Sequence, residues 1–151
     1  LAIGLEDYTA DIGAERTIDG TESSFARSMI VNSARAAGIQ PIDSVFSDFE
    51  NLQALRSVAK YSKSMGFVGM GCIHPAQIKI INESYQPSQT EIEKAKRIVL
   101  AFDEAQRRGV SVISLGSKMI DAPIVKRALN TIEMAIKCQL VKPNWKEEDG
   151  Q

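Results

Sequence analysis

The only histidine of the chain, His74, lies two residues after Cys72 and directly before Pro75. A cysteine and a histidine this close could form a nucleophile and its base, which must lie within hydrogen-bonding reach of each other. However, Cys72 belongs to the apolar run 67–73, where we expect a buried thiol that behaves as a small hydrophobe. No acid follows to orient the imidazole. We therefore expect His74 to hydrogen-bond a loop or to contact a ligand, and cysteine catalysis is disfavoured.

Three acids in two segments, Glu6, Asp7 and Asp121, are better suited to chemistry. Glu6 and Asp7 close the apolar segment 1–6, and a carboxylate at the end of a buried parallel strand suits Mg²⁺, which prefers oxygen ligands. Asp121 ends the segment 116–121, which begins with glycine and could hold a general base on a tight loop. Each acid also has a purely structural reading, because Asp7 could cap a turn and Asp121 could cap the helix that follows it.

Residue content excludes several other sites. One histidine and two distant cysteines, Cys72 and Cys138, cannot supply the four close ligands of a structural zinc site. The Gly-x-Ser-x-Gly pattern of serine hydrolases is absent. The glycines of 69–71 are not followed by the Gly-Lys-Ser/Thr of a phosphate-binding loop. The two cysteines also indicate no disulfide framework and favour a reducing, cytoplasmic location.

The composition is typical of a globular protein with a core. The 151 residues are 44% hydrophobic and 25% charged, with a formal net charge of −1. Basic residues are scattered among acids, so the sequence predicts neither a nucleic-acid partner nor a membrane surface. No apolar run reaches the roughly 18 residues of a membrane-spanning helix.

Strands and helices alternate in the first half, which predicts a parallel sheet with right-handed crossovers. Functional residues of such folds gather at the carboxyl ends of the strands. The acids Glu6, Asp7, Asp43 and Asp48 and the segment 72–74 fall there and could face one site. The second strand should begin after Pro41, which cannot donate to a ladder. The buried face of the first helix should consist of Phe25, Met29, Ile30, Ala34 and Ala37. The expected strands are 1–6, 39–46 and 67–73, with a loop at 7–20, and the expected helices run from about Glu22 to Gly38 and over 50–66 and 75–85.

The second half has a different pattern. A helix is expected over 87–109, opened by the capping box Ser88 to Glu91. A short strand at 110–115 and a helix at 124–138 should follow. We expect the tail 139–151 to be flexible, with Trp145 as its one anchor.

Five segments resemble, in order, the citrate lyase β subunit and its relatives, the acyl-CoA lyases of the HpcH/HpaI aldolase superfamily. They span about residues 1 to 135 and read GLEDYTADIGAERT, AGIQPIDSVFSDF, MGFVGMGCIHPAQI, YQPSQTEIEKAKRIV and GSKMIDAP.

The resemblance implies an α/β fold that is the C-terminal part of a TIM (β/α)₈ barrel, with about three βα units, plus a helical C-terminal extension. Residues 1–86 would form the partial barrel, 87–138 the helix–strand–helix extension and 139–151 the tail. A whole barrel needs about 250 residues, and the chain opens inside an apolar run without an initiating Met. We therefore expect a fragment of a longer protein.

The resemblance also implies a chemistry. Mg²⁺ would be held by Asp7 and by a Glu that would precede Leu1, and Asp121 would be the base, acting in a neighbouring subunit. Ile73, His74 and Pro75 would shape the CoA rim. The reaction would cleave a 3-hydroxyacyl-CoA, such as citryl-CoA to acetyl-CoA and oxaloacetate, or a malyl-CoA-like substrate. The partners would be further copies in a homo-oligomer such as a trimer, with other citrate lyase subunits, and the fragment alone should be inactive.

Two alternatives stay open. One is a CoA-independent, pyruvate-type class II aldolase of the same superfamily. The other is a non-catalytic scaffold subunit on the same fold. Met70 lends the scaffold slight support, because many relatives carry a lysine at this position and its loss bears on CoA contact.

Overall fold

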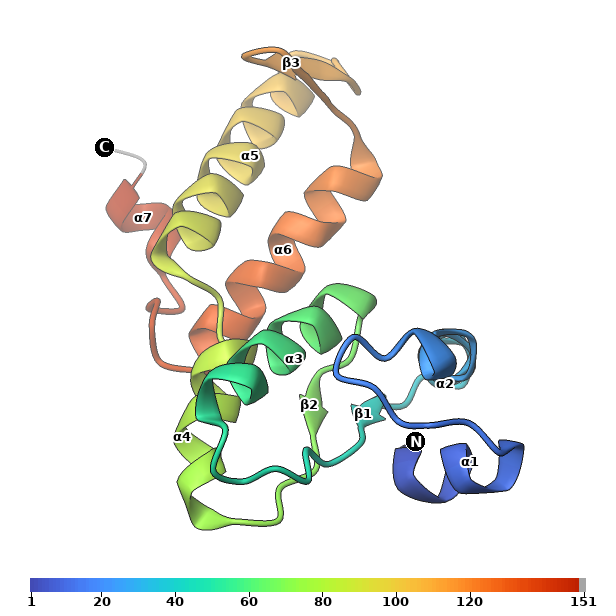
Figure 1. The fold of residues 1–151 in the computed structure, drawn as a ribbon. Coiled ribbons are helices and arrows are strands. Elements are labelled where there is room, and N and C mark those ends of the chain that lie inside the picture. The colour runs from blue at the N-terminus through green and yellow to red at the C-terminus, as the bar shows by residue number, and fades with distance from the viewer. Residues whose placement is uncertain (150–151) are drawn as a thin grey trace. The chain divides into compact units, whose positions relative to one another are not determined.

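The computed structural model describes residues 1–149 and contains two compact units, Leu1–Tyr85 and the part from Gln86 onwards (Figure 1). The first unit mixes helices with short parallel strands, and the second is a pair of helices joined by a hairpin. The predicted α/β class is confirmed.

The first unit contains three parallel chain segments. Ala2 pairs with Ile42 in a parallel bridge, and β1 (Ile42–Asp43) pairs in parallel with β2 (Gly69–Met70). The start of β1 directly after Pro41 confirms the prediction for that strand. The remaining elements of this unit are α1 (Leu5–Ile12), the 3₁₀ helix η1 (Thr21–Ser23), α2 (Ser24–Ala36), α3 (Leu52–Met65) and α4 (Pro75–Tyr85).

The beginning of the chain differs from the prediction of a strand at 1–6 and a loop at 7–20. Only Ala2 pairs as a strand, and α1 begins at Leu5. Leu5 and Thr9 are its buried residues, one turn apart, and Glu6 and Asp7 lie in its first turn, where the helix dipole favours acids. The two acids therefore stand on a helix and not in a loop after a strand.

Helices α3 and α4 agree with the prediction. Gly66 ends α3 in the left-handed region at φ +107°, and α4 begins at Pro75 as expected. The expected buried face of α2 is confirmed for Ala34, which is buried, and is wrong for Phe25 and Met29, which are 76% and 47% exposed. Arg27 is among the residues buried in their place.

Two apolar clusters form the cores. In the first unit Phe46, Leu55 and Ile81 pack together, and the partly buried Met70 packs against them. This contact gives Met70 an apolar packing role. The second cluster lies in the second unit and consists of Ala95, Ile98, Val99, Phe102, Ile120, Val125, Ala128, Ile132 and Trp145.

The second unit begins with α5 (Gln89–Arg107), whose predicted capping box is present: Ser88 and Glu91 exchange hydrogen bonds. Where one strand was expected, β3 (Ile113–Leu115) and β4 (Lys118–Ile120) form an antiparallel hairpin. α6 (Ala122–Lys137) follows and packs along α5 (Figure 1).

The tail contains one further element. Trp145 is buried in the second core, which confirms it as an anchor, and it opens the short helix α7 (Trp145–Asp149). The flexibility expected of the tail stays a prediction, and its last two positions, 150–151, lie outside the described residues. Within residues 1–149, no helix is long and apolar enough to cross a membrane.

Candidate functional site

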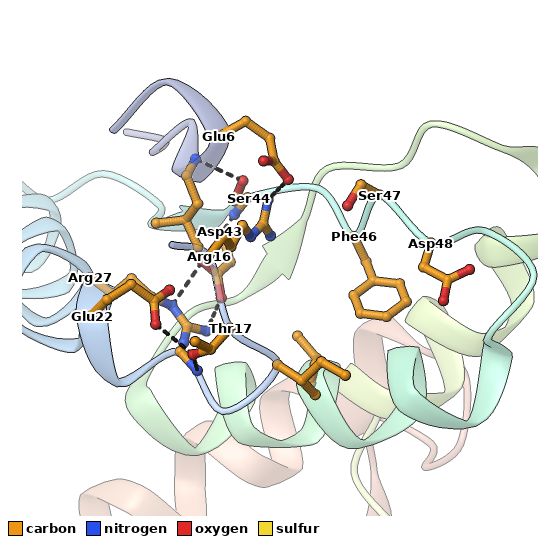
Figure 2. Close-up of a pocket in the computed structure, with 14 residues that line it drawn as sticks. Glu6, Arg16, Thr17, Glu22, Arg27, Asp43, Ser44, Phe46, Ser47 and Asp48 are labelled. Atoms are coloured by element: carbon orange, nitrogen blue, oxygen red, sulfur yellow. Dashed lines mark hydrogen bonds and ion pairs between the residues drawn. The ribbon is translucent and has the colours of Figure 1, made fainter. Parts of the chain in front are cut away.

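A cavity of about 330 Å³ lies in the first unit, where the segment after α1, the start of α2 and the end of β1 meet (Figure 2). Three acids that the sequence places at strand ends, Glu6, Asp43 and Asp48, contribute to its wall. The lining residues are Leu5, Glu6, Arg16, Thr17, Ile18, Gly20, Glu22, Arg27, Asp43, Ser44, Phe46, Ser47, Asp48 and Val58.

A buried ion pair forms one side of this cavity. The Arg27 guanidinium donates from Nε to Asp43 Oδ1 at 3.2 Å and from Nη2 to Asp43 Oδ2, and each side chain is only 3% exposed. The rings of Tyr61 and Phe67 lie 5.3 and 5.7 Å from the guanidinium carbon. Removal of one partner from such a pair costs about 3–5 kcal/mol, because the other charge is then buried alone. Asp43 is therefore a structural acid.

Ser44 connects this pair to the start of α1. Its backbone N–H donates to Asp43 Oδ1 at 2.9 Å, and its hydroxyl oxygen accepts from Leu5 N at 3.0 Å. The Leu5 N–H is one of the donors that a helix leaves unpaired at its N-terminus. Ser44 thus fixes the end of the helix whose first turn carries Asp7.

Glu6 and Asp7 differ in their surroundings. Arg16 pairs with Glu6 and also donates from Nη2 to the Val45 carbonyl at 2.7 Å, which ties the segment after α1 to the end of β1. The Asp7 side chain is exposed and makes no hydrogen bond or ion pair with any residue from 1 to 149. Its carboxylate lies against Gly4, where an added Cβ would approach Oδ2 to 3.2 Å. Asp7 is therefore the acid of this turn that is free to bind a ligand.

Glu22 closes the cavity near α2. Its Oε2 accepts from the Thr17 hydroxyl at 2.6 Å, whereas Oε1 is buried and has no hydrogen-bond partner in the described part of the chain. Burial by itself would raise the pKa of Glu22, but the Thr17 hydroxyl and nearby donors outweigh it and lower the pKa. The pKa of the neighbouring Asp19 is also lowered, first by Thr17 and then by the Thr21 N–H. Both acids therefore carry negative charge.

The segment 73–75 is held separately from this cavity. His74 stacks on the Phe49 ring, with centroids 5.0 Å apart and planes 20° apart. Its Nδ1 accepts from Ala76 N at 3.2 Å, so the proton of the neutral imidazole is on Nε2. The amide of the fully buried Gln77 accepts from the N–H groups of Ile73 and His74 and donates to the Phe46 carbonyl at 2.8 Å.

The prediction that the Cys72 thiol is buried is wrong. The thiol is exposed, not buried, and it donates to the carbonyl oxygen of His74 at 3.1 Å. The imidazole of His74 is engaged with Phe49 and Ala76, and within residues 1–149 no hydrogen bond joins this ring to the sulfur. The arrangement does not provide the base that a catalytic cysteine needs.

Asp121 stands in the second unit and is the N-cap of α6. Its Oδ1 accepts from Ile124 N at 3.2 Å, and a proline occupies the first turn. The structural reading of this acid is thus confirmed. The half-buried carboxylate follows β4 directly, so the hairpin fixes its position.

The structure gathers only part of the predicted site. Glu6, Asp43 and Asp48 share the cavity, whereas Asp7 and the segment 73–75 are not among its lining residues. No group of three His, Cys, Asp or Glu side chains within residues 1–149 could hold a metal. Asp7 nevertheless fits Mg²⁺ as one ligand, because this ion is usually bound by one or two carboxylates and completed by water and substrate oxygens.

Arg16, Arg27, Ser44 and Gln77 are the residues that sequence reasoning missed. A buried strand that carries Asp43 requires a cationic partner, and this requirement could have identified an arginine on a neighbouring helix. No local signal marks Ser44, because its hydroxyl accepts from the distant Leu5 N–H. Gln77 does carry one, because it lies three residues after His74, the spacing at which a glutamine reaches back to the N–H group before its helix.

Residues 1–75 match the sequence model of the HpcH/HpaI aldolase/citrate lyase family, which confirms the predicted resemblance to this family. It is 44% identical to citrate lyase subunit beta of Haemophilus influenzae over 135 residues, which cover 89% of the chain and 46% of that protein. It is 36% identical to mitochondrial citramalyl-CoA lyase of Homo sapiens over 135 residues, covering 89% of the chain and 40% of that protein.

A solved structure has a similar fold. CitE from Mycobacterium tuberculosis, in complex with magnesium, acetoacetate and coenzyme A, superposes with a TM-score of 0.77 at 28% identity over 89% of this chain and 51% of that one. The chain thus spans about half the length of the proteins that it matches.

Proposed function

We propose that this chain contributes the metal-binding aspartate and the base of a Mg²⁺-dependent acyl-CoA lyase, built as the last βα units of a (β/α)₈ barrel with a helical extension. The observation that carries the proposal is the free Asp7 carboxylate, fixed in the first turn of α1 by the bond from Leu5 N to Ser44. The relatives are named citrate lyase subunit beta and citramalyl-CoA lyase, which favours a 3-hydroxyacyl-CoA as substrate.

Each predicted residue has a role in this proposal. Asp7 holds Mg²⁺, and the bound ion supplies Lewis-acid polarisation of the substrate oxygen. Asp121, acting in a neighbouring subunit of a homo-oligomer, takes the hydroxyl proton in the cleavage direction. Ile73, His74 and Pro75 shape the rim for CoA, where the Nε2–H of His74 is an available donor and Phe49 extends the aromatic surface.

Asp7 is tested by metal binding. Asp7→Asn should abolish or strongly weaken Mn²⁺ binding, followed by the electron paramagnetic resonance of the free ion, because an amide does not supply the charge of a carboxylate. Asp11→Asn is the matched control, since Asp11 lies on the same helix and is also exposed. Equal Mn²⁺ affinity in both variants would remove the metal role of Asp7.

Asp121 is tested by separating its two roles. Asparagine caps helices about as well as aspartate but cannot act as the base. Asp121→Asn should therefore leave thermal stability unchanged and reduce the turnover of the complete protein about 10²- to 10⁴-fold. Asp121→Ala should lower both. Full turnover in Asp121→Asn would exclude the base assignment.

The class of reaction is tested by competition. Free CoA should inhibit a lyase that binds acyl-CoA, whereas an aldolase that uses pyruvate without CoA would be insensitive to it. A scaffold subunit would show neither turnover nor dependence on Mg²⁺.

A further inference from the structure

The second unit carries a groove that the proposed roles do not use. It has a volume of about 580 Å³ and runs between one face of α5, one face of α6 and strand β4. Its floor is apolar and includes the buried residues Ile98, Ile120 and Ala128. This volume lies within the range of about 300–1,000 Å³ that is typical of small-molecule sites.

Three cations stand around this floor. Lys94, Lys118 and Arg127 line the groove, and none of them forms an ion pair or a side-chain hydrogen bond with any residue from 1 to 149. The one acid in the lining, Glu91, is engaged at the N-terminus of α5, where its Oε2 accepts from Ser88 N at 2.8 Å. The groove therefore presents an excess of positive charge over an apolar surface.

This combination selects an amphipathic anion. Unpaired lysine and arginine side chains bind phosphate oxygens through charge-assisted hydrogen bonds, and the apolar floor suits an uncharged chain. CoA has this character, because its phosphates lie at one end and its pantetheine arm is largely uncharged.

The groove also adjoins Asp121. Ile120 and Ile124 both line it, and these two residues flank Asp121 in the sequence, with Ile124 N donating to the Asp121 carboxylate. A ligand in the groove would thus lie next to the residue that the proposed function makes the base.

We infer that Lys94, Lys118 and Arg127 form a phosphate-binding subsite for the CoA part of the substrate. The second unit would then carry both this subsite and the base. The inference rests on the proposed function and extends it to residues outside the rim at 73–75.

Two neighbouring residues of α6 provide a matched test. Arg127 lines the groove, whereas Lys126 is exposed and does not. Arg127→Gln should weaken CoA binding to the 151-residue chain roughly tenfold, as expected for loss of a charged hydrogen bond, and Lys126→Gln should change it less than twofold. Binding is measured by calorimetry at low salt, and amide NMR shifts locate the ligand. Neither side chain belongs to a core cluster, so both variants should fold, which circular dichroism verifies.

Other results would overturn the inference. One such result is an equal change of CoA affinity in the two variants, and a second is the absence of CoA binding to the chain. A third is a set of CoA-induced amide shifts confined to the first unit. A fourth is sedimentation showing that Arg127→Gln alters self-association while CoA affinity is unchanged. The last result would assign the groove to a second copy of the chain. CoA binding that persists in Arg127→Gln leaves the proposed function intact, whereas failure of that function appears separately, as absent turnover of the complete protein.

Discussion

Gln77 shows how a single buried amide can organise a binding surface. Its side chain satisfies two backbone N–H groups, those of Ile73 and His74, and one carbonyl, that of Phe46. These three bonds hold the turn before α4 to the end of β1. The orientation of the stacked His74 ring therefore depends on a residue that need not touch a ligand.

Replacement of Gln77 by methionine tests this role. Methionine has a similar volume but cannot make the three hydrogen bonds, so the turn and the Phe46 carbonyl would be left unpaired. We expect a loss of about 1–3 kcal/mol in the free energy of unfolding, measured with urea, and faster hydrogen exchange at the amides of Ile73 and His74.

Gln53→Met is the control, because Gln53 is exposed on α3 and makes no bond to this turn. Unchanged exchange at Ile73 and His74 in Gln77→Met would show that the turn is held by other contacts.

At the scale of single residues, the sequence indicates candidate side chains but does not predict their surroundings. Sequence reasoning disfavoured Cys72 as a nucleophile partly because the thiol was expected to be buried, and that reason is wrong, since the thiol is exposed. It weighed capping against catalysis for Asp121, and the cap is present. Burial and long-range hydrogen bonds depend on the packed chain, so they are not encoded in any short segment.

At the scale of elements, the capping box of α5 is the clearest case of a local signal that decides a structure. Ser88→Ala should destabilise the second unit by about 1 kcal/mol, because the Glu91 N–H loses its acceptor. The fluorescence of Trp145, the only tryptophan, reports on this unit during unfolding.

Thr90→Ala is the matched control in the same turn, since Thr90 is exposed and is not the cap residue. An equal shift of the unfolding midpoint in the two variants would contradict the capping role of Ser88.

Elements with local start and stop signals were predictable, and those without them were not. Gly66 and Pro75 set the end of α3 and the start of α4 as expected. The hairpin was missed although Gly116 and Ser117 are a typical two-residue turn between strands. α1 was missed because a short apolar run such as 1–6 fits a strand as well as the start of a helix.

The orientation of α2 depends on an interaction between elements. Its apolar residues Phe25 and Met29 predict one buried face, but the ion pair with Asp43 requires Arg27 to point inward. Hydrophobic periodicity cannot predict such an ion pair, because it assigns every polar residue to the exposed face of the helix.

At the scale of the whole molecule, Tyr85 ends the first unit and links its stability to pH. Burial raises the pKa of this phenol to about 12, although its hydrogen bond to Ser62 acts in the opposite direction. A raised pKa of an acid means that the folded state keeps its proton longer than the unfolded state. The contribution of the protonated Tyr85 to the free energy of unfolding is therefore fully present below about pH 10, and it is lost as the pH rises from about 10 towards 12.

Absorbance at 295 nm tests this prediction. One of the three tyrosines should ionise about two pH units above the ordinary value near 10, and this late step should vanish in Tyr85→Phe. The variant should also show a weaker decline in stability between pH 10 and 12. If the late step remains, it belongs to another tyrosine.

The parallel order of Ala2, β1 and β2 followed from the alternation of elements, and the family followed from five ordered segments. The proposed meeting of Asp7 with Asp121 rests on the family resemblance alone, because these two acids belong to different units of the chain. Such a site is a property of the assembly, so it stays a proposal that subunit experiments must test.

The buried pair of Arg27 and Asp43 also constrains how this sequence can evolve. Loss of either charge leaves the other buried without a partner, which destabilises the fold. A single substitution should therefore be selected against, even where simultaneous replacement of both residues would be tolerated. Viable variants should therefore change both positions at once or neither. The two residues form one inherited unit, although sixteen positions separate them in the chain.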